Sequence, residues 1–140
     1  MAFTGNAFCT SAKVGFLTGT YVPLTDTMKI ALYTNSATLD ATTTAYSATN
    51  EVVGTGYTAG GNTLTGNAIS YSGTTAWITF SDSAWTTATI TARGALIYDS
   101  SKSNAAIAVL DFGADKTSTA GTFTVQMPVA AASTALIRIA

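Results

Sequence analysis

The chain has 140 residues and a net charge of −1, and its charged residues make up only 9% of the sequence, against about 25% in an average soluble protein. The six basic residues are scattered and form no stripe that would bind phosphate backbones, which argues against a direct nucleic acid partner. No run of about 20 apolar residues is present, and the chain does not start like a signal peptide. We therefore expect a soluble protein with no membrane partner, made in a cytoplasm.

The first predicted element is a short helix between Asn6 and Thr18. Asn6 is suited to cap its start, and Gly19 is suited to end it. The apolar residues of this segment recur at spacings of three and four: Phe8, Cys9, Ala12, Phe16 and Leu17. Residues 1–19 are thus predicted to form an N-terminal helical segment. Cys9 is the only cysteine, so no internal disulfide is possible, and we expect a buried thiol.

After this segment the pattern becomes that of short strands separated by turn residues. Alternation of apolar and polar residues is clearest in TFTVQMP and TMKIALYT. The predicted strands cover residues 27–34, 68–71, 75–80, 87–92, 94–98, 105–112, 122–127 and 134–139. Many short threonine-rich strands predict an all-β fold, an antiparallel β-sandwich or jelly roll over residues 27–140. Residues 35–50 are predicted to form a long exposed loop, and the whole chain, 1–140, a single domain.

The segment EVVGTGYTAGG raises the question of a nucleotide site. Gly54 and Gly56, followed by an alanine, have the spacing of a dinucleotide-binding turn. That turn needs a helix whose N-terminus holds the pyrophosphate, whereas residues 60–71 favour strands. The ribose-binding acid is also missing at its usual distance, since the first acid is Asp82. We interpret the segment as a glycine-rich connection between strands and expect no cofactor.

The search for catalytic residues gives a largely negative answer. The chain has no histidine, which excludes a Ser-His-Asp triad, a Cys-His pair and a His-ligated zinc site. No pair among the seven acids is singled out as a glycosidase pair, and an aspartate at a strand end usually bonds to the turn backbone. Asp111 and Asp115 do not follow the ligand pattern of a calcium-binding loop. We expect no enzyme and no metal site.

Four aromatic residues are candidate partner contacts. Trp77 and Trp85 bracket the segment FSDSA, and a surface tryptophan in a β domain can stack on sugar, although it more often belongs to a core or an interface. Phe3 and Phe8 lie near a chain end. They either cover the core of the chain itself or anchor to another subunit, as aromatic hot spots do.

The order of segments in this chain resembles a known family. The segments are KIALYTNSATLD, EVVGTGYTAGG, ITFSDSAW, ARGALIYDSSKSNAAIAVLDFG and GTFTVQMP. In this order they are similar to the small virion structural proteins of tailed bacteriophages, of the head decoration or cement type. The resemblance implies a non-enzymatic protein bound in many copies to the outside of an HK97-like head. Its partners would be the major capsid protein and itself, as a homodimer or homotrimer. The alternative within the resemblance is a tail or fibre component that contacts host carbohydrate.

Overall fold

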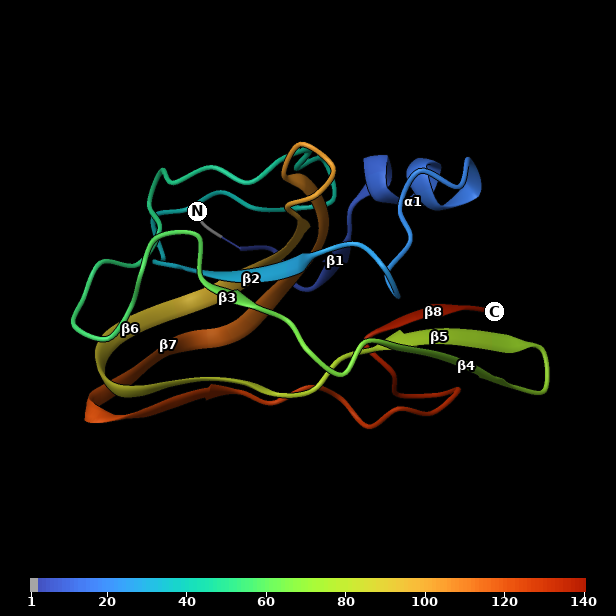
Figure 1. Cartoon of the computed structure of the whole chain (residues 1–140). Helices are drawn as coiled ribbons and strands as arrows, with labels where there is room; N and C mark the ends of the chain where they lie inside the picture. The colour runs from blue at the N-terminus through green and yellow to red at the C-terminus, as the bar shows by residue number, and fades with distance from the viewer. Residues whose placement is uncertain (1–2) are drawn as a thin grey trace.

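The computed structural model describes residues 3–140 and is built mostly of antiparallel β-strands, with one short helix (Figure 1). This confirms the predicted all-β class. A five-stranded sheet has the order β1-β7-β6-β2-β3. Its strands are β1 (Ala7–Phe8), β7 (Ala105–Val125), β6 (Ser83–Asp99), β2 (Met28–Tyr33) and β3 (Asn62–Thr63). A smaller sheet has the order β4-β5-β8. Its strands are β4 (Ala68–Ser72), β5 (Thr75–Thr79) and β8 (Ile137–Ile139).

The hairpin of β6 and β7 dominates the larger sheet and differs from the sequence prediction. Residues 87–92 and 94–98 were expected as two strands, but Gly94 lies inside the continuous β6 and pairs with Asp111 of β7. Residues 113–121 of β7 lack an apolar pattern, yet they remain in the strand because β6 supplies the pairing partner. Four register shifts interrupt the ladder. Such irregularities increase the local twist, and the hairpin bends in its middle, so that the halves of its strands far from the turn at residues 100–104 curl away from the core (Figure 1).

The helix α1 (Thr10–Leu17) starts later than predicted. Asn6 does not cap it, because the Asn6 Oδ1 accepts a hydrogen bond of 2.7 Å from the backbone N–H of Asp111. That contact lies beside β1, whose Ala7 and Phe8 pair with β7. The residue at the N-cap is Cys9, without a side-chain cap. The end of the helix agrees with the prediction, since Gly19 follows it at a φ of 74°.

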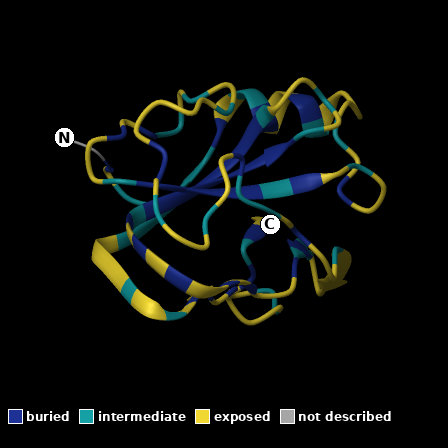
Figure 2. Cartoon of the chain, turned by 60° about the vertical axis from the view of Figure 1, so that its left-hand side comes forward, coloured by how far each residue is buried: buried dark blue, intermediate teal, exposed yellow. Residues whose placement is uncertain are grey.

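The core lies beneath β2 and the halves of β6 and β7 that flank the hairpin turn at residues 100–104. Five of the six residues of β2 are buried, and the last six of β6 are all buried (Figure 2). Ile78 and Ile137 from the smaller sheet belong to the same buried cluster. Residues 35–50 contain no helix or strand, as predicted, but they are not exposed throughout, because Ala37 and Leu39 are buried.

Candidate functional site

A buried carboxylate, Glu51, organises the glycine-rich segment. Its Oε1 accepts hydrogen bonds from the Tyr57 hydroxyl at 2.6 Å and from the Gly60 N–H at 2.7 Å. Its Oε2 accepts one from the Tyr46 hydroxyl at 2.6 Å. The side chain is buried, and a buried carboxylate is tolerated only when its lone pairs are satisfied. Here three donors from its own loop satisfy them.

Strands β2 and β6 hold the other side of this cluster. The Tyr57 hydroxyl also accepts from the Leu32 N–H at 2.9 Å, and the Tyr98 hydroxyl donates to the Gly60 carbonyl at 2.7 Å. The rings of Tyr46 and Tyr98 stack with centroids 4.7 Å apart. Burial raises the pKa of Tyr57 and of Tyr46, and the hydrogen bonds to Glu51 raise them further. These phenols stay protonated and act as hydrogen-bond donors, so the cluster is a structural anchor.

This geometry confirms that the glycine-rich segment is a connection between strands. The glycine-rich segment leads into β3 and then β4, so no helix follows it. Gly61 has a φ of 73°, and a Cβ there would overlap the carbonyl oxygen of Ile30. The glycines are therefore needed for close packing of the loop on β2. The amide of Gly60 already donates to Glu51 and is not free for a phosphate.

A second buried carboxylate, Asp99, lies at the end of β6. Its Oδ1 accepts hydrogen bonds from the N–H and hydroxyl of Ser101, at 3.0 and 2.6 Å, whereas its buried Oδ2 meets no donor. The carboxyl of Asp26 lies against it. Burial and the neighbouring Asp26 raise the pKa of Asp99. Two facing carboxyls are stable when one of them is protonated and donates to the other. A proton shared with Asp26 thus explains why the buried Oδ2 of Asp99 needs no other donor.

Asp26 keeps its charge for reasons that are also visible in the structure. Partial burial of Asp26 by itself raises its pKa. Three contacts outweigh this effect and lower the pKa: the N–H of Val22 donates to the carboxylate at 2.8 Å, Asp99 hydrogen-bonds to it, and the Lys102 ammonium lies 3.7 Å away. The Asp26–Asp99 pair thus joins the loop after α1 to the β6–β7 turn.

Among residues 3–140 no group of three or more acids or cysteines could hold a metal ion.

The four predicted partner contacts do not share one environment. Phe3 and Trp85 each expose only 4% of their surface, so both side chains contribute to the core of this chain. The Phe3 ring packs against Gly94, and Trp85 lies between Tyr57 and Phe123. Phe8 and Trp77 are half-buried. Only these two present surface that a partner could contact in this conformation.

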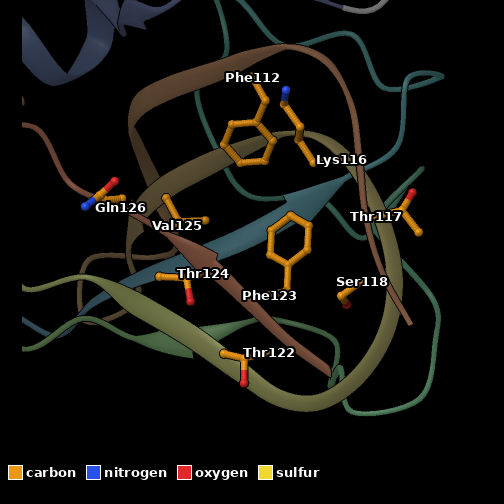
Figure 3. A pocket seen from close by; sticks show the side chains of 9 residues that line it. All are labelled: Phe112, Lys116, Thr117, Ser118, Thr122, Phe123, Thr124, Val125 and Gln126. Atoms are coloured by element: carbon orange, nitrogen blue, oxygen red, sulfur yellow. The ribbon is translucent and has the colours of Figure 1, made fainter. Parts of the chain in front are cut away.

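The curl of the hairpin encloses a hollow of about 450 Å³ (Figure 3). The rings of Phe112 and Phe123 lie in it, with centroids 6.3 Å apart. Around them are the amide of Gln126, the ammonium of Lys116 and hydroxyl side chains. The hydroxyl residues are Thr117, Ser118, Thr122 and Thr124. No sequence pattern predicted this hollow, because it depends on the register shifts that curve the hairpin.

An apolar surface is formed by the smaller sheet and α1. Directly paired residues of an antiparallel sheet share a face, and the register places six residues on one face: Ile69, Tyr71, Ala76, Ile78, Ile137 and Ile139. We call this the apolar face. Its inner end is covered by Phe16, Tyr21 and Val22, which line a groove of about 280 Å³ with it. Its outer end is exposed, and so is Leu17 on the neighbouring helix.

None of three comparisons with known proteins gives a match, whether with protein family models, curated proteins or solved structures. Within residues 3–140, the one helix is too short to span a membrane. The apolar face was not predicted as a site, although the alternation of apolar and polar residues in AISYS and TAWIT indicates a strand face of this kind. Sequence could not separate the buried acids from the exposed ones. The Asp26 partner of Asp99 lies far away in the chain, and the partners of Glu51, although near it in sequence, form no recognisable motif.

Proposed function

We propose that the chain is a non-enzymatic structural protein of a tailed phage virion, which binds the outside of the head in many copies and stabilises it. One observation carries this proposal beyond the resemblance in sequence. Exposed apolar side chains lie on α1 and the smaller sheet, bordered by the basic Lys13 and Arg138, in a protein with little charge elsewhere. A contiguous exposed apolar patch is typical of a contact surface. The major capsid protein is the proposed partner.

The proposed location follows from the same reasoning. The protein would be made in the host cytoplasm and then bound to the assembled head. A β-sandwich or jelly roll remains part of the proposal, supported by the buried cluster to which both sheets contribute. A ligand that binds the assembled lattice but not free subunits stabilises the lattice by linkage. Many weakly bound copies would therefore raise the resistance of the head to heat and osmotic shock.

The experiment compares heads with and without the protein, followed by adding back purified variants. Leu17 is 88% exposed on α1, whereas Val53 is 95% exposed in the glycine-rich segment. Leu17→Lys should weaken binding to heads, and the matched control Val53→Lys should bind as the unchanged protein does. Binding should saturate at a copy number set by icosahedral symmetry. A few copies at the tail, seen by electron microscopy, would contradict the decoration role.

The hollow in the curled hairpin favours a second candidate, a tail or fibre module that contacts host carbohydrate. Its half-buried Phe112 ring beside hydroxyl and amide groups suits the apolar face and hydroxyls of a sugar, with the buried Phe123 ring behind it (Figure 3). A glycan array probed with the intact chain tests this candidate. Signals that disappear in Phe112→Ala and persist in Val53→Lys would support it, and an array without signals would remove it.

A further inference from the structure

The smaller sheet ends in an edge strand that is unlike the other edges of the fold. The strands at the edges of the two sheets are β1 and β3, with two residues each, β8, with three, and β4, with five. Very short edges are a common protection against pairing with other chains. The outer edges of β7 beyond β1 and of β6 beyond β2 lie in the curled part of the hairpin. The register shifts bend both edges, Lys116 lies on β7, and Thr55 forms a bridge with Thr89 of β6. Strand β4 has neither protection.

The backbone of β4 is free on its outer side. All five residues of the strand are exposed, and its only partner is β5. Among the described backbone hydrogen bonds outside the strand ladders, none involves residues 68–72. The sequence AISYS has no charge and no proline. Such an edge presents a row of donors and acceptors that another strand can pair with.

We propose that two copies of this chain pair antiparallel along β4, about a two-fold axis through Ser70. Antiparallel pairing is compatible with two-fold symmetry, so one strand can pair with its own copy. With Ser70 opposite Ser70 of the second copy, Ile69 lies opposite Tyr71. Residues 69 and 71 belong to the same apolar face, so the two faces join into one across a six-stranded sheet. Aromatic and β-branched residues are a favourable cross-strand pair.

The absence of charge permits pairing with a second copy, and the small area sets the strength of the dimer. The apolar face carries no charged residue, so that two copies bring no like charges together. Two five-residue edges bury less than the roughly 1,000 Å² of a stable interface. The dimer is therefore weak in solution and becomes important where many copies are held close together. The pairing gives a definite surface to the self-association that the sequence resemblance implies. Its importance rests on the proposed function, but the pairing itself does not depend on capsid binding.

The first experiment is sedimentation of the intact chain over a range of concentrations. A monomer–dimer equilibrium is expected. Tyr71→Lys should raise the dissociation constant of the dimer at least about tenfold. The new ammonium of each copy lies opposite Ile69 of the other copy, so this unfavourable pair occurs twice in the dimer. Ile69→Glu should do the same. The double variant Ile69→Glu with Tyr71→Lys should recover the dimer, since the new carboxylate of each copy lies opposite the new ammonium of the other.

The second experiment fixes the register by a cross-link. Ser70→Cys places two thiols opposite each other at the axis, within the separation that a disulfide spans. Under mild oxidation it should form a covalent dimer much faster than the control Ser72→Cys. Cys9 is fully buried in both variants and does not compete.

Four outcomes would overturn the pairing: a strict monomer at the highest soluble concentration, a trimer, a dimer unaffected by Tyr71→Lys, or equal cross-linking at positions 70 and 72. Head binding by the same variants is measured separately. Absence of pairing in the unchanged chain, with intact head binding, would refute this inference alone, whereas a paired chain that binds no heads would refute the decoration role.

Discussion

The Tyr57 hydroxyl donates to the Glu51 carboxylate at 2.6 Å while it accepts from the N–H of Leu32 at 2.9 Å. One side chain of the glycine-rich segment thus satisfies a buried acid and a backbone donor of β2. The hydroxyl holds the loop to the sheet more directly than any apolar contact of that loop. This role explains why a tyrosine follows the two glycines in GTGY.

Tyr57→Phe should destabilise the fold without changing its shape. The substitution leaves the Leu32 N–H without its partner and removes one donor from Glu51, and a buried unsatisfied group costs about 1–3 kcal/mol. Chemical denaturation measures the free energy of unfolding. Tyr21→Phe is the matched control, because no hydrogen bond to the Tyr21 hydroxyl is present among the described residues. Equal stability of the two variants would contradict the anchor role.

Gly61 and Gly19 separate backbone strain from steric overlap. Their φ values are 73° and 74°, so an alanine suffers the same left-handed strain at both positions, roughly 1 kcal/mol. Only at Gly61 would the new Cβ overlap the Ile30 carbonyl, whereas Gly19 faces open space. Gly61→Ala should therefore cost at least about 2 kcal/mol more than Gly19→Ala. Thermal unfolding of both variants checks this difference, and similar losses would contradict it.

Phe3 is buried in the core of this chain, which favours the core role among the two that sequence left open for this residue. Phe3→Ala should lower the free energy of unfolding by about 3 kcal/mol, as expected for a large buried ring. Phe8→Ala removes a half-buried ring that packs on Phe16 and should cost less. Both variants are measured as isolated proteins by denaturation. A stable Phe3→Ala variant that fails only in binding to particles would restore the partner-contact role.

Much of this fold could be predicted because local pattern and tertiary structure agree. The strands expected at 27–34, 68–71 and 75–80 are found within two residues of their predicted ends, since each is a run of strand-forming residues bounded by turn residues. The failures have a common cause in distant partners. Residues 113–121 form a strand because β6 pairs with them. Asn6 does not cap the helix because its side chain accepts a hydrogen bond from the N–H of Asp111. Phe3 and Trp85 illustrate the same limit, since an aromatic residue does not reveal from its neighbours whether it is core or surface.

The Asp26–Asp99 pair makes stability depend on pH in two directions. The pKa of Asp99 is raised on folding, so its contribution is fully present below the unfolded pKa of about 3.9 and is lost as pH rises through the folded value. The pKa of Asp26 is lowered, so its contribution is present above about 3.9 and is lost as pH falls through the folded value. Between the two folded pKa values the pair holds one proton, and stability from this pair is greatest there.

Asp99→Asn should remove the loss of stability on the alkaline side. The asparagine amide donates to Asp26 at every pH, as the protonated carboxyl does, while its oxygen still accepts from Ser101. Denaturation series from mildly acidic to mildly alkaline pH, below the tyrosine range near about 10, should show a falling free energy of unfolding for the unchanged protein. The variant should show a flatter profile, more stable by roughly 1 kcal/mol at the alkaline end. Asp115→Asn, at an exposed position, is the control and should keep the original slope. Parallel profiles for Asp99→Asn and the unchanged protein would mean that the two carboxyls do not share a proton.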